Sequence, residues 1–129
     1  MSLLLDTNVL IAITEKQTDR LGWPIRHAIE DEGALLWASV ASLWEIAIKA
    51  GIGKLPISTP PSDLPTLLTD IGLNFLSIHP AHVLHDLDPL PPTRDPFDRL
   101  LLAQCALERL RLVTLDRALV DHPLAWRPA

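Results

Sequence analysis

The stretch LLLDTNVL, residues 3–10, joins an apolar run to a helical pattern through a single acidic residue. The run over 2–5 is short and uninterrupted, which is typical of a strand that is buried on both faces of a sheet. Asp6 therefore falls at the carboxyl end of a buried strand, and the helix expected over 7–14 begins directly behind it. A strand that leads at once into a helix indicates an α/β fold with a parallel sheet.

The rest of the chain repeats this alternation of strand and helix. We expect further strands over 34–38, 73–78 and 111–114, and an edge strand over 124–126. We expect helices over 19–32 (broken near Gly22 and Pro24), 39–50, 62–71 and 95–110, with helical turns over 81–86 and 117–121. Proline-rich loops are expected over 52–61 and 89–92. Together these elements predict one domain, 1–129, with a mostly parallel sheet that helices cover on both faces. Ligands of such sheets bind outside the carboxyl ends of the strands, where the strand order switches.

Composition narrows the class of protein. Apolar residues make up 48% of the chain, which argues against disorder. No apolar run is long enough to span a membrane, and the first residues do not resemble a secretory signal peptide. The single cysteine, Cys105, excludes an internal disulfide framework, fits a reducing cytosol and is expected to be buried. The net charge of −5 argues against coating nucleic acid by bulk electrostatics but not against a nuclease with an acidic metal site.

Three further motifs place acidic residues at the ends of buried elements. In SVASLWEIAIK, residues 39–49, Ser39 is the expected N-cap of a helix, and Ser42 and Glu45 share one side of it. Glu45 could equally be an exposed acid paired with Lys49 one turn later. The motif therefore does not by itself separate a functional acid from a surface ion pair.

The other two motifs lie near the C-terminus. In RDPFDRLLLAQ, residues 94–104, Asp95 is the expected N-cap before Pro96, and Asp98 points along the buried face. In LVTLDRAL, residues 112–119, Thr114 and Asp116 close a strand, although a turn or capping role is also open. Three arginines adjoin these acids and could contact phosphate or simply be solvated: Arg94, Arg99 and Arg117.

Several carboxylates at one site repel one another unless a cation holds them. Hard divalent cations such as Mg²⁺ prefer carboxylate oxygens, usually together with phosphate and water. The leading interpretation is therefore a metal-dependent enzyme that acts on phosphodiesters. A phosphatase is disfavoured because that chemistry needs a second acid where Asn8 stands. The spacing of His79, His82 and His85 is a weak metal signal, because steps of three drift around a helix. The four tryptophans are expected in the core or in an interface.

Taken in order, LLLDTNVLIA, SLWEIAIKAGIGKL, RDPFDRLLLAQCA and LVTLDRAL resemble the PIN-domain ribonucleases, and among them the VapC-type toxins of prokaryotic toxin–antitoxin modules. The resemblance covers nearly the whole chain. It implies a PIN-like three-layer α/β/α sandwich with a central, mostly parallel sheet, and Mg²⁺- or Mn²⁺-dependent endonucleolytic cleavage of RNA. It also implies a cytoplasmic prokaryotic protein, a homodimer without membrane association, and a cognate antitoxin that inserts a segment near the active site.

The resemblance carries the acidic site of the family onto four residues, Asp6, Glu45, Asp98 and Asp116. Asp6, Asp98 and Asp116 would hold the metal ion, and Glu45 would complete the site or orient the attacking water. Five positions match accessory residues of the family: Thr7, Asn8, Ser39, Asp95 and Thr114. Members of this subgroup often have a histidine where this chain has Thr93, so substrate specificity is expected to differ here. A non-catalytic interaction module, whose acids are caps and ion pairs, is the remaining alternative.

Overall fold

The computed structural model describes residues 1–128 and contains a central sheet of four parallel strands. The strands are β1 (Ser2–Leu5), β2 (Leu35–Ser39), β3 (Asn74–Leu76) and β4 (Arg111–Val113), in the spatial order β3-β2-β1-β4. The chain runs from β1 to one side of the sheet through β2 and β3, and then crosses to the other side of β1 to form β4. The strand order therefore switches between β1 and β4, which is where a parallel sheet offers a binding crevice.

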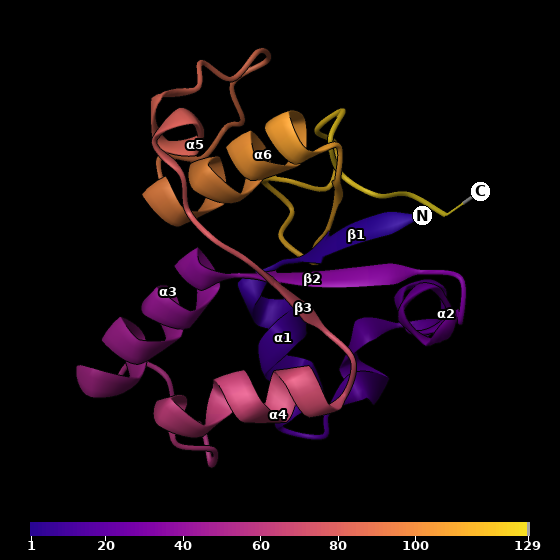
Figure 1. The fold of residues 1–129 in the computed structure, drawn as a ribbon, viewed down its shortest axis with the longest axis vertical. Coiled ribbons are helices and arrows are strands. Elements are labelled where there is room, and N and C mark those ends of the chain that lie inside the picture. The colour runs from indigo at the N-terminus through magenta and orange to yellow at the C-terminus, as the bar shows by residue number, and fades with distance from the viewer. Residues whose placement is uncertain (129) are drawn as a thin grey trace.

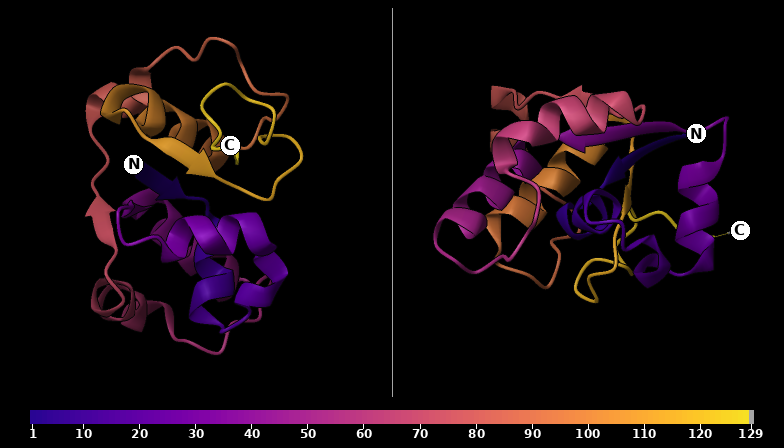
Figure 2. Two further views of the ribbon diagram at one scale, coloured as in Figure 1. Left: turned by 90° about the vertical axis from the view of Figure 1, so that its right-hand side faces the viewer. Right: turned by 90° about the horizontal axis from the view of Figure 1, so that it is seen from below.

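Helices cover both faces of this sheet and make the three-layer α/β/α fold that was predicted (Figure 1). One layer contains α1 (Thr7–Thr14), α2 (Trp23–Glu30) and α4 (Leu64–Asp70), and the other contains α5 (Pro80–Leu84) and α6 (Pro96–Glu108). Helix α3 (Val40–Gly51) leaves the carboxyl end of β2 and contacts both α1 and α6. The two layers are seen on opposite sides of the strands in Figure 2 as well.

The buried side chains form one cluster on each face of the sheet. Leu3 and Leu5 of β1 pack with Val9, Leu10 and the residues of α2 and α4, whereas Leu4 packs with Leu101, Leu102 and the rest of α6. All three leucines of β1 are fully buried. Alternate side chains of a strand point to opposite faces, so an uninterrupted apolar run is what a strand between two helical layers requires.

Most of the predicted elements are confirmed within one or two residues. The helix expected over 19–32 is broken as predicted, into a 3₁₀ turn, Thr18–Leu21, and α2, and Gly22 between them adopts a φ of 80°. The segment over 117–121 forms a hydrogen-bonded turn, as expected. The expected edge strand over 124–126 differs, because it is reduced to a single bridge between Leu112 and Ala125.

The tryptophans were expected in the core or in an interface, and the core position is confirmed for two of them. Trp37 and Trp126 pack against the two clusters, whereas Trp23 and Trp44 expose 72% and 59% of their surface, so for these two the interface stays a prediction. Cys105 is fully buried, as expected. Within residues 1–128, no helix combines the length and the apolar character that a membrane crossing requires.

Candidate active site

Asp6 lies at the point where β1 ends and α1 begins. Its side chain accepts hydrogen bonds from the Thr7 backbone N–H (2.8 Å) and from the Thr114 hydroxyl (2.6 Å), and it is 4% exposed. Its own N–H donates to the Val113 carbonyl of the neighbouring strand at 2.9 Å. Asp6 is thus the N-cap of α1, and the same carboxylate is held at the carboxyl end of β1, next to β4.

Glu45 is buried on α3 and is held by a side chain from α1. The Thr7 hydroxyl donates to Glu45 Oε1 at 2.7 Å and also lies 3.0 Å from the Ser42 hydroxyl. The other carboxylate oxygen, Oε2, accepts from the Lys49 ammonium at 2.5 Å. The ion pair with Lys49, one of the two interpretations of this motif, is present. The exposed position that this interpretation gave to Glu45 is wrong, since only 6% of the residue is accessible.

Asp95 and Asp98 begin α6, and the structure separates their roles. Asp95 Oδ1 accepts from the Phe97 N–H at 2.8 Å and from the Asp98 N–H at 3.4 Å, which confirms Asp95 as the N-cap. Asp98 is left with one hydroxyl partner, Thr93, which donates to Asp98 Oδ2 at 3.2 Å. The Thr93 oxygen in turn accepts from the Asp95 N–H at 3.1 Å. The threonine that replaces the expected histidine therefore connects the two acids.

Asp116 lies in the loop that follows β4, the strand next to β1. Its N–H donates to the Thr114 hydroxyl at 3.0 Å, and its Oδ1 accepts from the Ala118 N–H at 2.9 Å. The same Thr114 hydroxyl donates to Asp6, so one side chain links the loops that follow the two neighbouring strands. Asp6 and Asp116 therefore follow neighbouring parallel strands, β1 and β4.

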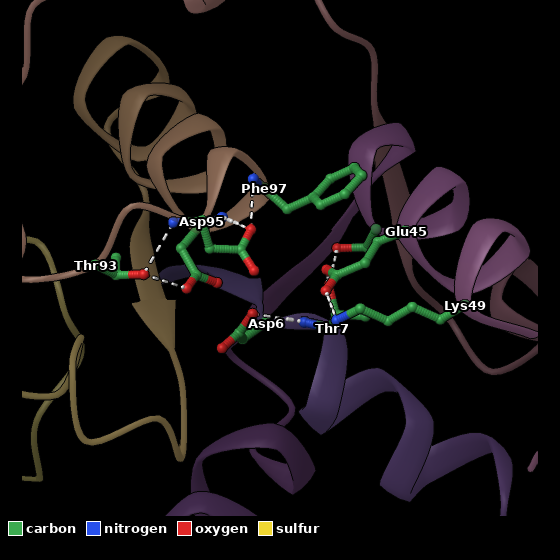
Figure 3. Close-up of polar contacts among 9 residues, drawn as sticks. Asp6, Thr7, Glu45, Lys49, Thr93, Asp95 and Phe97 are labelled. Atoms are coloured by element: carbon green, nitrogen blue, oxygen red, sulfur yellow. Dashed lines mark hydrogen bonds and ion pairs between the residues drawn. The ribbon is translucent and has the colours of Figure 1, made fainter. Parts of the chain in front are cut away.

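Figure 3 shows the side chains of Asp6, Glu45 and Asp95 gathered in the space between α1, α3 and α6. The titration of these groups reflects the crowding of negative charge. Burial, and then the charges of Asp95, Asp6 and Asp116, raise the pKa of Asp98 from 3.8 to about 7. Burial also raises the pKa of Asp6, against the hydrogen bonds from Thr114 and Thr7, and Glu45 and Asp116 raise it further.

The remaining predicted residues fall into two groups. Ser39 caps α3 by accepting from the Ala41 N–H at 3.0 Å, and it is fully buried rather than open to a ligand. Asn8 is exposed and lines a surface cavity of about 480 Å³ with Asp116 and Arg20. Among the three arginines proposed to bind substrate, Arg94 and Arg117 are exposed, whereas Arg99 is half-buried and its Nε donates to the Thr93 carbonyl at 2.9 Å.

Comparison with known families agrees with this arrangement, because residues 3–123 match the PIN domain family. The chain is a PIN-domain protein. PIN domains are generally nucleases, and they often depend on a divalent metal ion. No protein of curated function matches the chain.

The donor set of this PIN domain suits a hard divalent cation, because it consists of carboxylates with hydroxyl groups behind them. Burial raises the pKa values of Asp98 and Asp6, and neighbouring carboxylates raise them further, so a bound cation would stabilise the ionised site. Within residues 1–128, however, no three Asp, Glu, His or Cys side chains lie close enough together to hold a metal ion as they stand.

Two residues of the site were not assigned a role from the sequence. Lys49 was considered only as a surface partner of Glu45, yet Figure 3 shows its side chain running inward to the carboxylate. Its i+4 spacing from Glu45 was the available signal, and the burial of Glu45 was the missing fact. Gln104 is fully buried on α6, where its Oε1 accepts from Ser39 at 2.6 Å and its Nε2 donates to the Ser77 carbonyl at 3.2 Å.

His82, one of the three histidines that gave a weak metal signal, forms a second polar cluster with Gln104. His82 is buried; its Nδ1 accepts from the His79 N–H at 3.0 Å, and its Nε2 lies 3.0 Å from Glu108. Gln104 Nε2 also lies 3.4 Å from His82 Nδ1. These contacts fasten α5 to α6 and leave both ring nitrogens of His82 engaged, so the geometry is that of a structural histidine.

Proposed function

We propose that this chain is an endoribonuclease that hydrolyses RNA phosphodiester bonds with a divalent cation, Mg²⁺ or Mn²⁺. Asp6, Asp98 and Asp116 would hold the cation. The observation that carries the proposal is the position of Asp6 and Asp116 after neighbouring strands at the switch in strand order. Beside them, burial and then the charges of Asp95, Asp6 and Asp116 raise the pKa of Asp98 to about 7. A structural cluster has no reason to bring like charges together at a crevice.

A bound divalent cation would supply positive charge against the phosphate and lower the pKa of a water molecule. The side chains of the protein have complementary tasks. Thr114 and the Thr7 N–H hold Asp6 in place, and Thr93 holds Asp98. Glu45, fixed from one side by Thr7, would complete the site or orient the attacking water.

Substrate binding by this acidic chain needs both the cation and a few basic side chains. Arg94 and Arg117 are exposed beside the acids of the site and are the better candidates for phosphate contact. Arg99 is engaged with the Thr93 carbonyl and would act first by holding that loop. We expect RNA binding to weaken strongly when the cation is removed, and to weaken further in Arg94→Ala and Arg117→Ala.

The direct test incubates the purified chain with an end-labelled RNA oligonucleotide in Mg²⁺, in Mn²⁺ and in EDTA. We expect internal cleavage products with either cation and none in EDTA. A phosphatase would instead release phosphate from p-nitrophenyl phosphate and leave the RNA length unchanged. A non-catalytic interaction module would do neither, and either result would refute the proposal.

We further propose that the protein is the toxin of a toxin–antitoxin module, a cytoplasmic homodimer inhibited by a cognate antitoxin. A cleft of carboxylates accepts a basic side chain readily, because arginine pairs with carboxylates in bidentate fashion. The antitoxin should therefore place an Arg or Lys within hydrogen-bond reach of Asp6, Asp98 or Asp116, and the complex should be inactive until the partner is removed. An inhibited complex whose partner contacts only remote surfaces would contradict this.

A further inference from the structure

Lys49 is the basic side chain that reaches into the acidic site. It extends from α3 and its ammonium contacts Glu45 Oε2 at 2.5 Å (Figure 3). The two partners differ in exposure: the Lys49 side chain is 43% accessible and that of Glu45 only 8%. The lysine thus brings its charge from the surface to a carboxylate that water hardly reaches, with its aliphatic stem lying along the helix.

The charge of Lys49 acts on more than its direct partner. Its pKa is raised first by the hydrogen bond to Glu45, and then by the charges of Glu45, Asp95 and Asp98, against the effect of burial. Asp95 and Asp98 belong to α6, on the far side of the site from α3. The ammonium therefore interacts favourably with Glu45 of α3 and with the two acids at the start of α6.

The contact also fixes the orientation of Glu45. One carboxylate oxygen accepts from Thr7 and the other accepts from Lys49, so the group is held between α1 and the end of α3. Without the lysine, a buried carboxylate would keep one hydroxyl donor and lose its only charged one. A buried charge that loses its partner destabilises the fold more than any exposed ion pair stabilises it.

We propose that Lys49 is a positioning residue that serves as the built-in counter-ion of the acidic site, and that a divalent cation entering the site competes with its ammonium. The first half of this proposal concerns the metal-free protein and stands on the contacts alone. The second half rests on the proposed function, because it needs the cation site. It makes Lys49 a residue that stabilises the empty site and weakens metal binding, two effects that a simple surface ion pair would not combine.

The test compares Lys49→Met with Lys54→Met. Lys54 is exposed and lies five residues further on, so the control loses the same charge from the same residue type. In EDTA, we expect Lys49→Met to lower the melting temperature by about 5 °C or more, since it leaves Glu45 uncompensated. By titration calorimetry, we expect Lys49→Met to bind Mn²⁺ about tenfold more tightly than Lys54→Met, because one repelling charge is gone.

Two further variants keep the proposal decidable. Lys49→Arg retains the charge and should keep Mn²⁺ affinity near that of the wild type. Lys49→Met combined with Glu45→Gln removes the uncompensated carboxylate and should recover most of the lost melting temperature. This double variant can be measured even if Lys49→Met alone fails to fold. The counter-ion role is overturned if Lys49→Met and Lys54→Met have the same melting temperature in EDTA. Competition between Lys49 and the cation is overturned if Lys49→Met binds Mn²⁺ no more tightly than Lys54→Met. If no form binds Mn²⁺, the wild type included, both the competition and the metal site of the proposed function are overturned.

Discussion

Two buried polar clusters lie along α6, and they are built in opposite ways. Near its start, Asp98 shares the site with Asp95, Asp6 and Asp116, and burial first, and then their charges, raise its pKa. Further along, Gln104 joins Ser39, Ser77 and His82 by hydrogen bonds between neutral groups. The one carboxylate of that second cluster, Glu108, has a side chain that is 40% exposed. Within residues 1–128, no buried side-chain nitrogen or oxygen lacks a hydrogen-bond partner. The two clusters therefore differ in their charge and not in how completely their polar atoms are hydrogen-bonded.

The difference in charge separates side chains that stabilise the fold from side chains that the fold holds in place at a cost in stability. A satisfied neutral network fixes how helices and strands pack, and it stabilises as long as every member is present. Accumulated negative charge does the reverse, because each added carboxylate raises the pKa of the others and lowers the stability of the ionised protein. Substitutions in the two clusters should therefore affect activity and stability in opposite proportions.

The largest effect is expected from Asp98→Asn. Cleavage of RNA should fall by about 100-fold or more, because the variant loses a charge that would hold the cation. The free energy of unfolding in EDTA should stay the same or rise, since like-charge repulsion is relieved. Asp6→Asn and Asp116→Asn should also abolish cleavage. Full activity in any two of these three variants would exclude the assigned site.

The next largest effect is expected from Gln104→Leu, with the opposite signature. The substitution removes the acceptor of the Ser39 hydroxyl and the donor to the Ser77 carbonyl. Buried groups left without partners cost about 1–3 kcal/mol each, so the free energy of unfolding should fall by about 2–4 kcal/mol. Urea unfolding measures this loss. The rate of RNA cleavage, measured at a temperature where the variant is folded, should stay within a few-fold of the wild-type rate. A loss of activity as large as that of Asp98→Asn would contradict the proposed difference between the two clusters.

The sequence predicted the charged cluster better than the neutral one, for a physical reason. Asp6 ends an apolar run and Asp95 precedes a proline at a helix start, so local pattern alone placed both. Gln104 looks like one more polar residue on a helix, and its partners lie 65 and 27 positions away. The inward path of Lys49 likewise depended on the burial of Glu45. Such facts arise from tertiary packing, which no local pattern contains.

A smaller effect is expected from Asp95→Ala. The substitution removes the N-cap of α6, which should lower the free energy of unfolding by about 0.5–2 kcal/mol. The value should lie toward the lower end, because Asp95 also raises the pKa of Asp98 and its removal relieves that repulsion. Asp98→Ala should instead lose activity before stability. Thermal unfolding and cleavage rates measured side by side would show the reverse pattern if the two roles were exchanged.

The smallest effect is expected from titrating Asp98 in metal-free protein. In the unfolded chain its carboxyl ionises near 3.8, whereas the folded protein retains the proton until about pH 7. Between these values the folded state binds more protons than the unfolded state, so stability falls as the pH rises through this window and levels off above it. Because Asp98 is only half-buried, solvent screens much of the effect. In EDTA, the wild type should therefore lose stability relative to Asp98→Asn between pH 5 and pH 8, as followed by urea unfolding. A difference that stays constant, or that grows in favour of the wild type, would mean that the charges around Asp98 are already compensated and that the two clusters of α6 are alike.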